Sequence, residues 1–151
     1  MIEERLTELG LELPQAAAPI ASYVPVHVAG ELAFVAGQVP LADGKPTIVG
    51  TVGKDVTMGQ AQEAARRCAL QALAALRNAL GSLDRVAAIA KLDVFVAAGK
   101  GFDQMSTVAN GASDVLVEIF GEAGKHARAA VGVRSLPLGT PVEVAVTARV
   151  V

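Results

Sequence analysis

The sequence has little aromatic and little basic character. It contains no tryptophan, one tyrosine and four phenylalanines in 151 residues, and its net charge is −2. So few rings offer no evident platform on which nucleic-acid bases would stack. Arg66 and Arg67 form the one basic cluster, and they fall on the expected solvated face of a helix. Nucleic acid is therefore not an expected partner.

Metal-binding and cofactor-binding patterns are also missing. A single cysteine, Cys68, excludes an internal disulfide and a cysteine-rich metal site, and its alanine neighbours favour a small buried thiol. His27 and His126 are far apart and lack metal-ligand spacing with the carboxylates. There is no phosphate loop, dinucleotide fingerprint or Gly-x-Ser-x-Gly motif. We expect no metal and no cofactor.

Long apolar runs are absent as well. No stretch of about 18 apolar residues is present, so no membrane span is expected. The start, MIEER, is charged and lacks the pattern of a signal peptide, so the expected location is cytoplasmic. The chain length fits one domain with a real core. The hydrophobic content of 52% is mostly alanine and valine, which favours tight packing or subunit contact.

Hydrophobic periodicity then predicts the elements. Helices are expected at 2–9, 57–80 and 102–120; Thr57 and Gln60 resemble a capping box, and Gly81 and Gly121 are stop signals. A small-residue stripe marks the buried side of the longest helix: Ala61, Ala64, Ala65, Cys68, Ala72, Leu76, Ala79 and Leu80. Strands are expected at 22–29, 32–36, 47–52, 85–96, 127–133 and 142–150, the first two as a hairpin.

This order predicts an α+β fold, with a mixed β-sheet and two helices packed on one face. We divide the chain into an N-terminal helix and linker (1–18) and a main domain (19–151). No third long helix is available for the other face of the sheet. That face is therefore expected to be buried against another subunit.

Arg128 is the most informative residue. On its side of the 127–133 strand it is followed by Ala130 and Gly132, which would leave room beside the guanidinium. A planar fork of donors beside open space suits bidentate capture of a carboxylate. The alternative is a strand-end arginine in a surface ion pair.

Glu143 is the second candidate. A tight hairpin between the last two strands would place it opposite Arg134, as a structural cross-strand pair. The same register separates Arg128 from Glu143 by about 20 Å. If both residues are functional, they must meet across a subunit boundary.

Three weaker candidates remain. Tyr23 precedes a strand, where a packing role is the alternative. Asn110 shares a helix face with Asp103, Ser106 and Ser113, which by default is solvated. Gly37 follows an apolar strand and could present backbone N–H groups to a ligand.

Together these segments resemble the Rid family (RidA/YjgF, also called endoribonuclease L-PSP), in a branch with slightly longer chains. The resemblance covers roughly residues 19–150. It rests on Tyr23 and on the motifs FVAGQVP (34–40), ALRNAL (75–80), KLDVFV (91–96), VAN (108–110), ARAAVGVRSLP (127–137) and PVEV (141–144). It implies a chorismate-mutase-like fold assembled as a homotrimer with clefts between subunits.

The resemblance also implies a chemistry. Family members hydrolyse 2-aminoacrylate-type enamines and their imines to 2-oxo acids and ammonia, without a cofactor. By motif, Arg128 would bind the substrate carboxylate, and Glu143 of a neighbouring subunit would hold or deprotonate the attacking water. Tyr23, Gly37, Asn110 and Ala130 would line the substrate cleft.

Two departures concern the substrate. Ala36 stands where many members have Ser or Thr, and Ala130 stands where many have Cys. Both changes widen or dry the pocket. Two further functions stay open: a trimeric module that binds a small carboxylate without converting it, and an endoribonuclease. The sequence speaks against the endoribonuclease, because it lacks a clustered His or Lys pair and a basic stripe.

Overall fold

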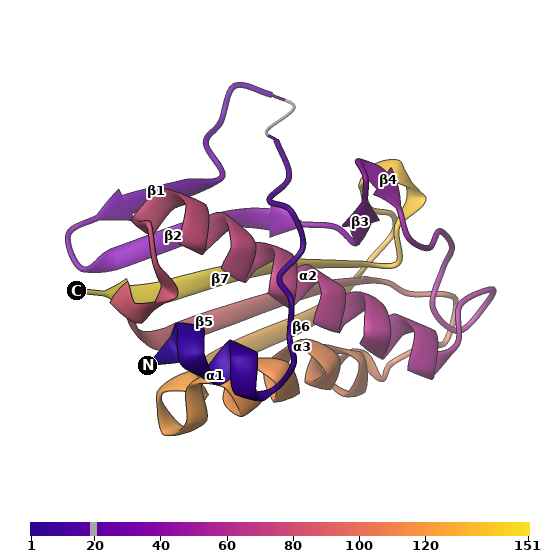
Figure 1. Cartoon of the computed structure of the whole chain (residues 1–151). Helices are drawn as coiled ribbons and strands as arrows, with labels where there is room; N and C mark the ends of the chain where they lie inside the picture. The colour runs from indigo at the N-terminus through magenta and orange to yellow at the C-terminus, as the bar shows by residue number, and fades with distance from the viewer. Residues whose placement is uncertain (19–20) are drawn as a thin grey trace.

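A computed structural model describes residues 1–18 and 21–151 of the chain. It contains a five-stranded mixed sheet (Figure 1). The β5–β6 pair is parallel and the other three pairs are antiparallel. The predicted mixed sheet is confirmed. Its strands in spatial order are β1 (Val26–Ala29), β2 (Leu32–Gln38), β7 (Val142–Val150), β5 (Val86–Ala97) and β6 (Ala127–Val133).

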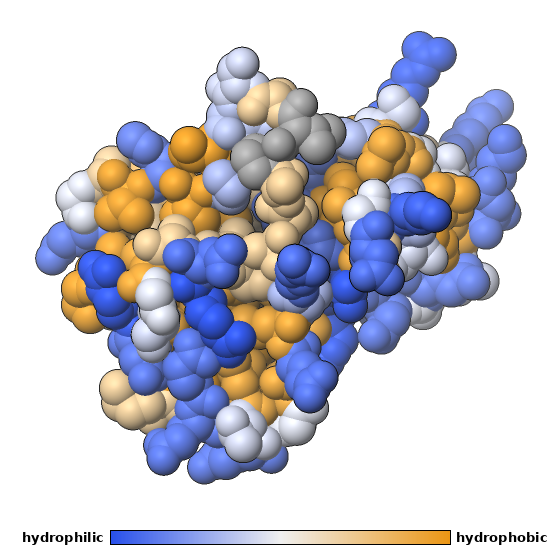
Figure 2. Space-filling view, turned by 45° about the horizontal axis from the view of Figure 1, so that its top comes forward, coloured by the Kyte–Doolittle hydropathy of each residue, from blue (hydrophilic) through white to orange (hydrophobic). Residues whose placement is uncertain are grey.

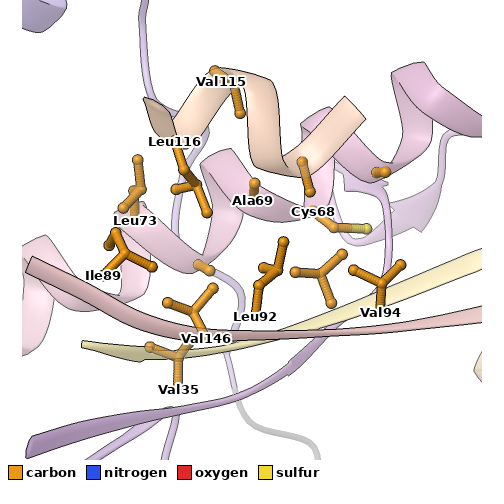
Figure 3. Close-up of a cluster of buried hydrophobic side chains, with 14 of the residues drawn as sticks. Val35, Cys68, Ala69, Leu73, Ile89, Leu92, Val94, Val115, Leu116 and Val146 are labelled. Carbon is orange, nitrogen blue, oxygen red and sulfur yellow. The ribbon is translucent and has the colours of Figure 1, made fainter. Parts of the chain in front are cut away.

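Two long helices cover one face of this sheet, as the α+β prediction requires. They are α2 (Met58–Leu80) and α3 (Met105–Phe120), which contact each other and the strands beneath them. Figure 3 shows Leu73 and Leu116 pointing from these helices toward Leu92 and Val146 of the sheet. The shorter helices are α1 (Ile2–Glu8), η1 (Leu83–Arg85), η2 (Gly121–Gly124) and η3 (Pro137–Gly139).

Helix α2 begins and ends where its sequence signals predict. The Thr57 hydroxyl accepts from the Gln60 N–H, and the Gln60 side chain accepts from the Thr57 N–H. Gly81 ends the helix with a left-handed φ of 87°. The small-residue stripe lies in the core except for Ala79, which is exposed. Cys68 is buried as predicted, and burial raises the pKa of its thiol well above the usual value.

The predicted strand at 47–52 is wrong. A two-residue turn at Asp43 and Gly44, both with positive φ, instead closes a very short hairpin between β3 (Leu41–Ala42) and β4 (Lys45–Pro46). Beyond this pair the Thr47 N–H still donates to the Pro40 carbonyl, but Pro40 has no N–H to return a bond, so the ladder ends there. Within 47–52, only Val52 makes β-bridges.

Two other elements start later than predicted. The first strand begins at Val26, because residues 22–25 form bends and Pro25 contributes only its carbonyl, which accepts from Ala36. Helix α3 begins at Met105, because Phe102 ends a turn from Gly99. Phe102 packs against the core from outside the helix.

The N-terminal helix α1 belongs to the same core. Leu6 is buried, and the Asp84 carboxylate accepts from the backbone N–H groups of Ile2 and Glu3. The Glu3 carboxylate accepts two bonds from Arg77 and one from the N–H of Leu83. Burial acts to raise the pKa of Glu3, but these bonds outweigh it, and the pKa lies below its usual value. The domain boundary at 18/19 falls at the edge of the described residues, since Pro19 is outside them, and stays a prediction.

The predicted hairpin between the last two strands is also wrong. Strand β5 lies between β6 and β7, so Glu143 is opposite Phe95 and not Arg134. The reason is the crossover: α3 carries the chain back over the sheet, and β6 therefore joins β5 in parallel, at an edge. Strand β7 pairs with the other side of β5 and with β2.

The second face of the sheet has no helix on it in the described part of the chain. It presents Phe34 (43% exposed) and Val131 (46% exposed), together with Phe95 and the alternate residues of β7. Val131 lies opposite Phe95, so its side of β6 is the uncovered one. On the side of the molecule drawn in Figure 2, apolar patches are interrupted by hydrophilic residues. None of the helices described is long and apolar enough to cross a bilayer.

Candidate functional site

Arg128 is held against α3 by three hydrogen bonds to neutral groups. Its Nη1 donates to Asn110 Oδ1 (2.8 Å) and to Ser113 Oγ (3.1 Å), and its Nη2 donates to the carbonyl of Ser106 (3.3 Å). These three α3 residues lie on one helix face because they are three and four positions apart. The helix therefore fixes the plane of the guanidinium.

The guanidinium keeps two donors unused. Of its five N–H groups, three are engaged, so Nε–H and one hydrogen of Nη2 have no partner within 1–18 and 21–151. No ion pair found in that part of the chain includes Arg128. A positive charge with two free donors can accept a carboxylate. The alternative prediction of a surface ion pair is not supported by these contacts.

The space expected beside Arg128 is only partly present. Ala130 packs against the core, and a Cβ on Gly132 would lie 3.3 Å from Cβ of Ala98 and 3.7 Å from Sδ of Met105. Helix α3 thus fills the room beyond the small residues of β6. What remains accessible is the outer side of the guanidinium.

Glu143 lies on the opposite face of the sheet, beside Gly37. A Cβ built on Gly37 would lie 2.6 Å from Oε2 of Glu143, so any larger residue there must displace the carboxylate. Strand β2 shifts register between Val35 and Gln38, a bulge that brings Gly37 against Glu143. Burial raises the pKa of Glu143 above its usual value.

A cavity of about 420 Å³ opens in front of this carboxylate. Its walls are largely apolar and come from the linker, from the segment around β2 and from η3; they include Ala18, Tyr23, Gly37, Leu138 and Glu143. Tyr23 is 49% exposed and lies in a bend before β1, so it is not a core residue. A half-buried carboxylate with a raised pKa inside an apolar cavity is suited to take up and return a proton.

The predicted residues thus fall into two groups. Arg128, Asn110 and Ala130 lie at the β6 edge on the helix side, whereas Tyr23, Gly37 and Glu143 surround the cavity. Arg128 pairs with Leu92 and Glu143 with Phe95, so they are three residues and two strand spacings apart, about 14 Å. The predicted 20 Å was too long because its register was wrong. One chain still does not unite the two groups.

Sequence reasoning missed two residues of the Arg128 group. Ser113 was assigned to a solvated face, and His126 was considered only as a metal ligand. His126 Nε2 lies 2.9 Å from Ser113 Oγ, and its Nδ1 lies 2.6 Å from the carbonyl of Gly124. The spacing carried a signal: Ser113 is one helical turn from Asn110, and His126 is two residues before Arg128 on the same side of an extended chain.

Comparison with known proteins gives a consistent result. Residues 3–150 match the family model described as "YjgF/chorismate mutase-like, putative endoribonuclease". Protein TCP17 of Trypanosoma cruzi is 46% identical over 144 residues, which cover 95% of this chain and 90% of that protein.

Solved structures agree with this match. A protein of unknown function from Agrobacterium tumefaciens is 42% identical, with a TM-score of 0.89, covering 99% of this chain and 91% of the other. A protein from Shewanella oneidensis, named as a putative endoribonuclease, is 35% identical with a TM-score of 0.95 over 99% of each chain. The YjgF gene product of Escherichia coli is 26% identical, with a TM-score of 0.62, over 89% and 93% of the two chains.

Proposed function

Because the chain belongs to the YjgF/chorismate mutase-like family, also known as the Rid family, we propose that it hydrolyses reactive 2-enamine and 2-imino acids to 2-oxo acids and ammonia. The substrates would be of the 2-aminoacrylate and 2-iminopropionate type. The observation that carries the proposal is the Arg128 guanidinium, oriented by neutral partners and left with two free donors.

Arg128 would bind the substrate carboxylate. Nε–H and the free Nη2 hydrogen belong to one planar group, from which a carboxylate can accept two hydrogen bonds. Asn110 would hold the guanidinium in place, and Ala130 would line the substrate side of β6. A fixed carboxylate leaves the neighbouring imine carbon at a defined position, which lowers the entropic part of the barrier.

Glu143 would handle water and protons. An imine carbon is already electrophilic, so the reaction needs a positioned water and a group that moves its proton. Glu143 would take one proton from the attacking water as the C–O bond forms and deliver it to the nitrogen of the resulting carbinolamine. The C–N bond then breaks, and the carbinolamine hydroxyl gives its remaining proton to the departing ammonia. The balance is R–C(=NH₂⁺)–COO⁻ + H₂O giving R–CO–COO⁻ + NH₄⁺. The raised pKa of Glu143 supports this role, because it brings the carboxyl closer to neutral pH.

We further propose that the site is completed between subunits of a homotrimer. Arg128 and Glu143 lie on opposite faces of one sheet, and the helix-free face carries apolar residues such as Phe34 and Val131. Docking of one subunit's β6 edge onto its neighbour would bury part of that face. It would also bring Tyr23, Gly37 and Glu143 of the neighbour opposite Arg128.

A coupled assay tests the function. A pyridoxal-phosphate serine dehydratase releases 2-aminoacrylate, and pyruvate formation is followed while the dehydratase is kept in excess. The protein should accelerate pyruvate release, and Arg128→Ala and Glu143→Gln should each remove the acceleration. Wild-type protein that leaves the spontaneous rate unchanged with several such imines would contradict the proposal.

Two other functions are distinguished by the same preparations. A non-catalytic module would bind 2-oxobutanoate in an Arg128-dependent way without accelerating imine hydrolysis. An endoribonuclease, the name attached to the family, would cleave RNA in an Arg128- or Glu143-dependent way. His27 on β1 and His126 before β6 lie at opposite edges of the sheet, which does not favour a two-histidine ribonuclease site within one chain.

A further inference from the structure

We propose that His126, acting through Ser113, is a positioning residue that orients Arg128 for carboxylate binding. This inference rests on the proposed function for its kinetic consequence. The observation behind it is a continuous chain of hydrogen bonds from Gly124 through His126 and Ser113 to the guanidinium.

The partners at its two ends fix the direction of this chain. The carbonyl of Gly124 can only accept, so Nδ1 of His126 carries the hydrogen in the 2.6 Å contact. In the neutral ring, Nε2 is then an acceptor. The Ser113 hydroxyl must donate to it across 2.9 Å, which turns a lone pair of Oγ toward Arg128.

An oriented hydroxyl matters because Arg128 can only donate. A hydroxyl that rotated freely would often point its hydrogen at Nη1, where it would be repelled. With His126 in place, Ser113 and Asn110 occupy both hydrogens of Nη1. The guanidinium can then neither turn about its long axis nor offer Nη1 to the ligand, and Nε–H with the free Nη2 hydrogen faces outward.

The three residues come from separate elements. His126 follows η2, Ser113 lies on α3 and Arg128 lies near the start of β6. The short return from η2 to β6 brings the imidazole beneath the helix, on the same side of the chain as Arg128 two residues later. Among the described residues, His126 belongs to no cluster of three or more potential metal ligands.

Kinetics of imine hydrolysis provide the first test. Ser113→Ala and His126→Leu should raise KM by about 3- to 10-fold and leave kcat within about 2-fold, because the lost contact acts equally on substrate and transition state. Ser113→Thr keeps the hydroxyl, and His126→Gln keeps an acceptor near the position of Nε2. Both variants should have KM values within about 2-fold of wild type.

A second test does not depend on turnover. ¹⁵N NMR of the wild-type protein, at a pH at which the imidazole is neutral, should show that His126 carries its hydrogen on Nδ1. Titration with 2-oxobutanoate should give a Kd that rises in Ser113→Ala and His126→Leu in the same order as KM. Thr7→Ala removes an exposed hydroxyl on α1 and serves as the control for hydroxyl loss. Thermal unfolding of each variant identifies any that fails to fold.

The outcomes separate this inference from the proposed function. If the wild type hydrolyses no imine, but the tautomer is as expected and the Kd rises in Ser113→Ala and His126→Leu, the proposed function fails and the positioning role holds. If hydrolysis is normal, but Ser113→Ala changes neither KM nor Kd, the positioning role is wrong. A tautomer protonated on Nε2 would also overturn it, whatever the activity, as would a fall in kcat at constant KM.

Discussion

A mixture of two inactive variants tests the separation of Arg128 and Glu143. Arg128→Ala leaves the Glu143 group intact, and Glu143→Gln leaves the Arg128 group intact, because the two residues lie about 14 Å apart on opposite faces of one sheet. Each variant alone should be inactive. When subunits of the two are mixed, some boundaries should join an intact Arg128 to an intact Glu143, and activity should return.

The size of the recovery follows from counting boundaries. In a random 1:1 mixture, about half of the subunits supply Arg128, and about half of their neighbours supply Glu143. About one quarter of the sites are then complete, whatever the number of subunits in a closed ring. A second mixture combines wild type with the double variant Arg128→Ala/Glu143→Gln. It should give about one quarter of wild-type activity if the site is shared between subunits, and about one half if the site lies within one chain.

The subunits are mixed by co-expression or by joint refolding, and activity is measured in the coupled dehydratase assay. Arg128→Ala mixed with the double variant contains no Arg128 and serves as the zero-activity control. Light scattering should give about 46 kDa for a trimer, three times the 15.4 kDa of one chain.

Two results would refute the reasoning. Absence of recovery in the first mixture, despite mixed oligomers shown by mass spectrometry, would mean that both residues act within one chain. Half-maximal activity in the second mixture would lead to the same conclusion. Either result would be incompatible with Arg128 and Glu143 lying on opposite faces of one sheet.

Gly37→Ala should lower kcat by about 100-fold, because the new Cβ, 2.6 Å from Oε2, displaces the Glu143 carboxylate by roughly 1 Å. The substitution should have no effect on kcat in a Glu143→Ala background. Denaturant unfolding should show that it changes stability by no more than about 1 kcal/mol. The raised pKa of Glu143 means that its burial favours folding only when it is protonated, so Glu143→Gln should raise Tm at pH 7, and this difference should disappear as the pH falls below the usual carboxyl pKa. Glu3 has a lowered pKa, so its ion pair with Arg77 should stabilise the protein above the usual carboxyl pKa and be lost as the pH falls through the lower value; Glu3→Gln should therefore flatten the acid side of the Tm profile. Thr57→Ala should lower the free energy of unfolding by about 1 kcal/mol, which calorimetry should show as a Tm decrease of about 2–4 °C. The kcat and KM values should not change, because the capping box stabilises α2 and includes no residue of the Arg128 or Glu143 group.

Local signals in the sequence were reliable where one element decides its own form. The capping box at Thr57 and the stop at Gly81 are set by contacts within a few residues, and both were predicted correctly. The bounds of the last two strands were also predicted correctly, from their alternating pattern. The strand expected at 47–52 failed because β-propensity competed with the turn at Asp43–Gly44, which fixes pairing only with its immediate neighbours. Propensity alone does not show which partner a short strand will find.

The sequence by itself determined the α+β architecture, the stripe of small residues that packs α2 on the sheet, and the candidate pair Arg128 and Glu143. Only the tertiary structure decided that β5 separates their strands and that they face opposite sides. Only it linked Ser113 and His126 to Arg128. The physical reason is that strand order depends on the path of the α3 crossover. The direction of a hydrogen bond likewise depends on the partner at its far end. Strand order and hydrogen-bond direction therefore relate residues of different elements, which the periodicity within one element does not show.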